Sequence, residues 1–137
     1  MLPHNLTKEV RPMKYDVNVK DNDVVTILMD GARALVHDSG KAFREARNDG
    51  ESSEETLNYH EYNHLKAKAM LASLRYTYAR NLAVDAKTYK PDTPVGRADL
   101  AVYAADTAKA KAEYAFAVLV ADEAMAAWRE SYSHKYK

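Results

Sequence analysis

The strongest constraint in this sequence is a heptad pattern in its last third. Residues 97 to 134 contain no proline or glycine and many alanines. Apolar and small residues recur there in alternating steps of three and four, at Leu100, Tyr103, Thr107, Ala110, Tyr114, Ala117, Ala121, Ala124 and Trp128. This spacing, kept over four heptads, is typical of a helix that packs along its length in a coiled coil. The segment therefore needs a long helical partner.

The composition of this seam indicates how closely the partner approaches. Its alanines let another helix come near, whereas the larger residues Leu100, Tyr103, Tyr114 and Trp128 fill gaps or contact another subunit. We interpret these four as a packing or oligomer seam. A flanking row widens the apolar surface: Phe116, Val118, Val120 and Met125. That width predicts either a third helix against this one or contacts between copies.

Two further helices are expected upstream. The first, over about 23–48, follows a cap at Asn22 or Asp23 and ends at the Asn-Asp-Gly of residues 48–50. Its expected apolar positions are Val24, Leu28, Leu35, Ala42, Phe43 and Ala46. Gly31 and Gly40 weaken it, by about 1 kcal/mol each relative to alanine. The second, over about 53–89, begins after Ser52 or Ser53 and stops at KPDTPVG, where two prolines and a glycine interrupt the chain. The third takes about 97–134.

Residues 1–22 precede these helices as an arm. Tyr15, Val17 and Val19 alternate with polar residues, the period-two pattern of a short strand that pairs or drapes over the rest. The predicted fold is therefore all-α, a long-helix hairpin or three-helix bundle with coiled-coil packing. It comprises an extended arm at 1–22 and a single helical domain at 23–137, and we expect it to be oligomeric.

Composition excludes several functional classes. The 137 residues suit one domain. Because 20 basic side chains balance 20 acidic ones, the net charge does not indicate a nucleic-acid or membrane partner. The absence of cysteine removes disulfides, thiol nucleophiles and thiolate metal sites. We expect a cytoplasmic protein, because the sequence shows neither a signal peptide nor a membrane span.

The pentad HEYNH at residues 60–64 matches the spacing by which zinc peptidases hold their metal. In that reading His60 and His64 bind zinc and Glu61 is the general base. However, both histidines fall in line with Ala67, Leu71, Leu74 and Tyr78 on a packing face. No glycine turn or third histidine follows, and the chain offers no sheet along which an extended substrate could lie. We therefore expect no metal, cofactor or catalytic residue, and keep the zinc peptidase as an alternative. A di-iron bundle is disfavoured because the Glu-x-x-His spacing is not repeated.

Charge is polarised along the second helix. Five acids and no base occupy residues 49–61, whereas six bases stand against one acid over residues 66–90. The candidate nucleic-acid-binding residues are Lys66, Lys68, Arg75, Tyr76, Arg80 and Lys87. At 100° per residue Lys68 and Arg75 share one line, and Arg80 and Lys87 lie round the back. Cations interleaved with aromatic rings suit a single strand, although the same pattern fits a solvated helix end.

Residues 57–132 resemble a known family. A basic helix, LKAKAMLASLRYTYARNLA, is followed by KPDTPVG and then by RADLAVYAADTAKAKAEYAFAVLVADEAMAAWRESYSH. This order resembles the UvsY-type recombination mediators of bacteriophages and related small phage single-strand DNA-binding proteins. Arg75 matches the family's basic residue in the second helix. Ser73 stands where the family has lysine, so Lys68 and Arg80 would substitute. The last helix is about one heptad shorter than the family's.

The resemblance implies a non-catalytic protein that assembles into a ring-like homo-oligomer and binds single-stranded DNA. It would help a recombinase replace the single-strand binding protein, in the host-cell cytoplasm if the chain is phage-encoded. The first alternative is a helical protein-protein interaction module, such as a phage inhibitor or assembly factor. Both functions need a helical bundle with a spare face, so the sequence does not separate them.

Overall fold

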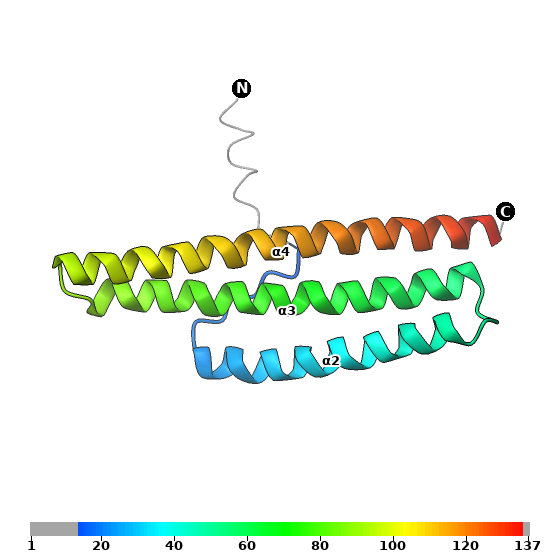
Figure 1. Cartoon of the computed structure of the whole chain (residues 1–137), viewed down its shortest axis with the longest axis horizontal. Helices are drawn as coiled ribbons and strands as arrows, with labels where there is room; N and C mark the ends of the chain where they lie inside the picture. Colours follow the sequence, from blue (N-terminus) through cyan, green and yellow to red (C-terminus); the bar gives the residue numbers. More distant parts are fainter. Residues whose placement is uncertain (1–13, 136–137) are drawn as a thin grey trace, which may run out of the picture.

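The computed structural model describes residues 14–135, so residues 1–13 of the expected arm lie outside the described residues. Three helices follow one another, α2 (Asn22–Asn48), α3 (Glu54–Tyr89) and α4 (Pro94–Lys135) (Figure 1). The described residues contain no β-strand. The predicted all-α class is therefore confirmed.

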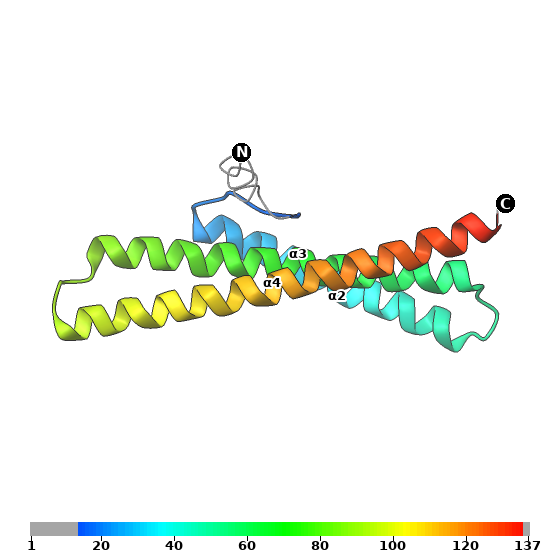
Figure 2. The ribbon, with the colours of Figure 1, turned by 90° about the horizontal axis from the view of Figure 1, so that it is seen from above.

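The three helices form an open layer with α3 in the middle. The α3 helix packs against α4 on one side and α2 on the other (Figure 1), and α2 and α4 make no contact with each other among the described residues. Seen from above, α4 crosses over α3 (Figure 2). Each outer helix thus has a single helical neighbour. One of our two expectations was a third helix packed on the wide apolar surface of α4. The α2 helix does not fill this role, because among the described helices it contacts only α3.

The α3–α4 hairpin is packed through aromatic rings. Tyr114 of α4 is fully buried, and its ring stacks on Tyr76 of α3 at 6.0 Å between centroids. Trp128 lies 5.3 Å from the ring of Tyr59 and 6.0 Å from that of Tyr62. Every position of the predicted seam is buried or half-buried, including Leu100 and Tyr103, whereas most other positions of α4 are exposed. The seam therefore lies on the side of α4 that faces α3 in the same chain.

The turn into α4 explains why this helix begins earlier than the sequence suggested. The Thr93 hydroxyl accepts a hydrogen bond of 3.0 Å from the Gly96 amide, so Thr93 caps the helix and Pro94 occupies its first position. We expected a start near Arg97 because proline and glycine read as breakers. A Cβ on Gly96 would lie 1.9 Å from the Pro91 carbonyl oxygen, so only glycine fits this tight turn.

In the first half of α2 the core contains a different row from the one expected, although the expected Ala46 is buried. Val25, Met29 and Ala32 are buried against Leu71 and Leu74. The expected Val24 and Leu28 are each 42% exposed. The α2 helix carries two apolar rows one residue apart, and periodicity alone does not decide which of them meets α3. Its cap also differs, since Asp21 accepts a bond from the Asp23 amide.

The arm runs along α3 in extended form, and regularly spaced hydrogen bonds join the two like the rungs of a ladder. Ser73, Thr77 and Asn81 donate side-chain hydrogen bonds to the carbonyls of residues 15, 17 and 19, in that order. Four helical residues rise about 6 Å and two extended residues about 6.6 Å, so the two spacings nearly match. The side chains of Val17 and Val19 meanwhile pack on the α2–α3 core. The ladder and the apolar contacts together hold the arm on one face of the layer, along the stretch of α3 from Ser73 to Asn81.

A substitution at Asn81 can test how much this ladder contributes to stability. The Asn81 amide donates to two groups, the Val19 carbonyl at 2.8 Å and the Asn22 side chain at 2.9 Å. We expect Asn81→Ala to lower the free energy of unfolding by about 2 kcal/mol in urea denaturation, since both acceptors lose their donor. Trypsin should also cleave faster after Lys20. The control is Thr88→Ala, at an exposed hydroxyl that bonds within its own helix. If both variants lose the same free energy of unfolding, the ladder stabilises the protein no more than an exposed hydrogen bond within a helix does.

Candidate nucleic-acid interface

The six residues expected to bind a strand are divided between the two faces of the layer. Lys68 and Arg75 are exposed and lie about 20° apart around α3, since seven residues make nearly two turns. Tyr76 and Arg80 lie on the side covered by the arm. The six therefore do not form one continuous surface.

Arg80 and Tyr76 have partners inside the chain. The Arg80 guanidinium donates a hydrogen bond of 3.1 Å to the Val17 carbonyl and lies 5.1 Å from the centre of the Tyr76 ring. Tyr76 in turn stacks on Tyr114. These two residues hold the arm and the α3–α4 hairpin together, so their basic and aromatic pairing has a structural use.

Lys66 and Lys87 occupy separate places. The Lys66 ammonium lies 6.0 Å from the Tyr62 ring, and its side chain borders a hollow of about 750 Å³ beside Tyr15 of the arm. Lys87 is exposed in the last turn of α3. Neither lies on the side of α3 that carries Lys68 and Arg75, because each is rotated by about 100° or more from them.

A groove between α2 and α3 brings Arg75 together with a cation that the sequence reading missed. Arg33 of α2 and Arg75 of α3 both line this groove, which has a volume of about 440 Å³. Thr26, Met29 and Tyr78 complete its lining. Arg33 also pairs with Asp30 at 2.9 Å, an exposed ion pair worth little energy that leaves the guanidinium able to change partner.

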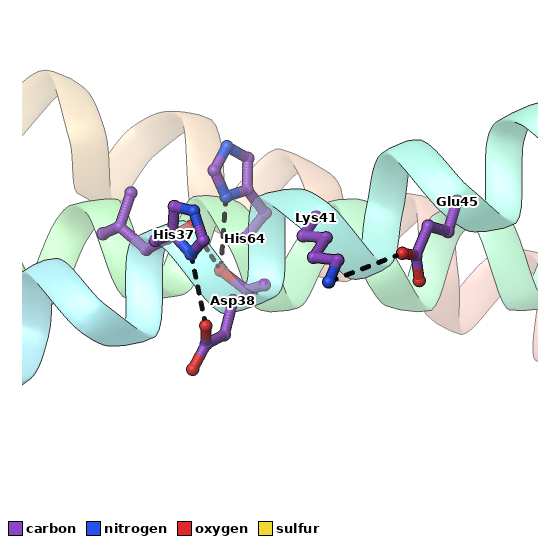
Figure 3. A network of polar contacts seen from close by, with 7 residues as sticks. His37, Asp38, Lys41, Glu45 and His64 are labelled. Atoms are coloured by element: carbon purple, nitrogen blue, oxygen red, sulfur yellow. Dashed lines mark hydrogen bonds and ion pairs between the residues drawn. The ribbon is translucent and has the colours of Figure 1, made fainter.

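His64 shows that two more cations lie farther along the same two helices. Burial lowers the pKa of its imidazole below the usual 6.5, and the positive charges of Lys68 and Arg44 lower it further, against the effect of a hydrogen bond at Val36. The ring nitrogen Nδ1 lies 3.2 Å from the Ser39 hydroxyl of α2 (Figure 3). Lys68 of α3 and Arg44 of α2 are therefore close enough to act on one imidazole.

Arg33, Arg44, Lys68 and Arg75 will be called the cation row. Arg33 and Arg44 are 11 residues apart, which places them within about 20° on α2. This spacing is readable in the sequence, but it gains meaning only once α2 is known to lie beside the basic half of α3. The row thus combines two residues that the sequence predicted with two that it did not.

The pentad HEYNH has a packing role in this structure. The His64 ring lies against α2 so closely that a Cβ on Gly40 would be 2.9 Å from its Cε1 atom. His60 contacts the ring of Tyr59. Within the part of the chain that the structure describes, no cluster of three or more histidine, cysteine or acidic side chains could hold a metal ion. His64 thus fills the α2–α3 interface at the point where Gly40 lets the helices approach.

The chain matches no family model, and neither a curated protein nor a solved structure is significantly similar to it. None of the described helices combines the length and apolar character that crossing a membrane requires. Any function must therefore be argued from the geometry of this chain itself.

The lowered pKa of His64 predicts acid sensitivity. In the unfolded chain His64 takes up a proton near pH 6.5, whereas in the folded protein it does so only at lower pH. Its contribution to stability is thus present above pH 6.5 and is lost as the pH falls below it. We expect His64→Gln to make the free energy of unfolding, measured by urea titration at successive pH values, fall less steeply on acidification. His37→Gln, at an exposed position, is the control, and identical slopes in the two variants would contradict this reading.

Proposed function

We propose that this protein binds single-stranded DNA without catalysing a reaction, and that it does so as a homo-oligomer of the recombination-mediator type. The observation that supports this best is the cation row, which lies on α2 and α3 away from the arm. Four positive side chains gather there in a chain with no net charge, so the local field differs from the global one.

The groove also offers an aromatic ring. Tyr78 lines it beside Arg33 and Arg75, so a base can stack on the ring while flanking phosphates meet the guanidinium groups. Stacking of this kind needs an unpaired base, which favours a single strand over a duplex. It is also tolerant of sequence, because every base has a π-face.

This proposal narrows the set of residues expected from the sequence. Lys68 and Arg75 remain, and Arg33 and Arg44 join them. Arg80 and Tyr76 support the arm, and Lys66 and Lys87 lie apart from the cation row.

Assembly would raise the affinity of such a small site. Each phosphate contact releases counterions and weakens as salt rises, so one subunit with four cations binds a strand poorly at physiological salt. Several subunits on one strand act at a high effective concentration. The help given to a recombinase against a single-strand binding protein rests on the resemblance to phage mediators described above, and is part of the same proposal.

The test is fluorescence anisotropy of a labelled oligo-dT strand titrated with the protein over a range of salt. We expect affinity to fall steeply with salt, and the double variant Arg33→Gln/Arg75→Gln to bind more weakly at every salt concentration. The slope of log affinity against log salt should become shallower by about 1.4, since each lost phosphate contact on a single strand removes about 0.7.

A matched control changes the same amount of charge elsewhere. Lys109 and Lys111 are exposed on α4, and Lys109→Gln/Lys111→Gln should leave both affinity and slope nearly unchanged. If the two double variants lose affinity equally, binding follows net charge and the cation row is not the site. No binding by the unaltered protein at low salt would remove the DNA proposal entirely.

The protein-interaction alternative has its own observation. Phe116 and Leu119 of α4 are 67% and 57% exposed, which is unusual for such large apolar side chains on one helix. A helical partner protein could cover them. Pull-down of a partner that survives nuclease treatment and is lost with Phe116→Ser would favour this second function.

A further inference from the structure

Gly31 lies in the first half of α2, at a point where none of the described residues requires a glycine. A Cβ at this position would meet nothing within 4 Å, and the backbone there is ordinary helix. At Gly40 and Gly96, by contrast, an added Cβ would press on His64 or on the Pro91 carbonyl. Glycine inside a helix costs stability relative to alanine, so its use at Gly31 points to a neighbour that the described residues of one chain do not supply.

The residues around Gly31 form an exposed apolar row. Ile27 is 70% exposed, and Val24, Leu28 and Leu35 are each exposed by more than 40%. With Gly31 they follow steps of three and four, the spacing by which one helix packs along another. This exposed row is separate from the buried row of Val25, Met29 and Ala32 that faces α3. The α2 helix therefore presents one packing face to α3 and a second one that the described residues leave largely uncovered, bordering at Leu35 the hollow beside Tyr15 of the arm.

The exposed row is self-complementary in shape. Leu28 lies three residues before Gly31 and Leu35 four residues after it. If two copies of α2 cross antiparallel at Gly31, Leu28 of each copy faces Leu35 of the other, and the two glycines meet where the backbones are closest. Such a twofold arrangement uses one patch twice, which is the commonest way in which identical chains pair.

Charge supports the same register. Asp23 lies eight residues before Gly31 and Lys41 ten residues after it, and both are exposed. In the antiparallel crossing the carboxylate of one copy comes near the ammonium of the other at both ends of the contact. A parallel pairing would instead put like charges at the same level of the two helices and bring no carboxylate of this pair near an ammonium.

From these observations we infer that α2 is a homodimer interface, in which a second copy of this chain packs antiparallel on Val24, Ile27, Leu28 and Leu35 with its closest approach at Gly31. This deepens the homo-oligomer of the proposed function by assigning its contact surface. The interface does not involve the cation row, so it can be tested in the absence of DNA.

The experiment is sedimentation velocity of the full chain without DNA over a range of concentrations. We expect a dimer. Gly31→Leu should raise the dissociation constant of this dimer by at least about tenfold, because a side chain at the crossing keeps the backbones apart. Helix content and the thermal midpoint of the dilute Gly31→Leu protein should not fall, since the position is open in the single chain. Leu119→Glu on α4 is the matched control and should leave the dimer intact.

Cysteine cross-linking tests the register, because the chain has no cysteine of its own. Gly31→Cys should form a disulfide with itself under mild oxidation. Leu28→Cys alone should not, whereas a mixture of Leu28→Cys and Leu35→Cys should join one chain of each kind. Self-linking of Leu28→Cys as fast as that of Gly31→Cys would establish a parallel pair and overturn the inference.

Two further outcomes would also overturn it. A monomer at the highest soluble concentration shows that α2 pairs with nothing of its own kind. A dimer that dissociates with Leu119→Glu and survives Gly31→Leu places the interface on α4. Failure of DNA binding with the α2 dimer intact would count against the proposed function and leave this interface standing.

Discussion

The packing of α3 between two helices that do not touch each other governs the rest of this structure. In a closed three-helix bundle each helix buries one apolar stripe against two neighbours, and all stripes meet in one core. Here α3 is packed on opposite sides, by Leu71 and Leu74 toward α2 and by Tyr76 toward α4. The layer therefore has two broad faces, and what covers each face decides what the molecule can do.

The arm covers one face, and its means of attachment explains the buried polar residues of α3. Ser73, Thr77 and Asn81 would be costly to bury without partners, because each carries a donor that water would otherwise satisfy. The arm's carbonyls satisfy them, and Tyr114 donates to the Lys14 carbonyl in the same way. A phenol is protonated at neutral pH and can donate, and burial raises the pKa of this one further, to about 12. These four bonds use arm backbone, the Lys14 side chain adds an ion pair with Asp122 of α4, and Val17 and Val19 supply the apolar contacts.

The sequence predicted the buried face of a helix correctly where only one row of residues had the spacing and size of a packing face. The α4 seam contains Tyr114 and Trp128 at heptad positions, so one register was clearly better than the rest. On α2, Val24 and Val25 begin two rows of similar quality, and only the position of α3 chooses between them. The ladder of Ser73, Thr77 and Asn81 was missed because polar residues four apart also describe an exposed face. Helical geometry already separated Lys68 and Arg75 from Arg80 and Lys87, but only the structure shows that Arg80 bonds to the arm.

The open layer also explains why so much apolar surface is exposed on the outer helices. A monomer normally scatters its exposed apolar residues, whereas Ile27, Leu28 and Leu35 gather on one side of α2 around a glycine. Because α2 has a single helical neighbour, a second copy can reach this side without disturbing the contact with α3. Thr26 and Arg33, which line the groove, lie about 100° to 180° around α2 from the exposed row, so pairing there leaves the groove accessible. Assembly and strand binding would then use different sides of the same helix, and a dimer would present two cation rows instead of one.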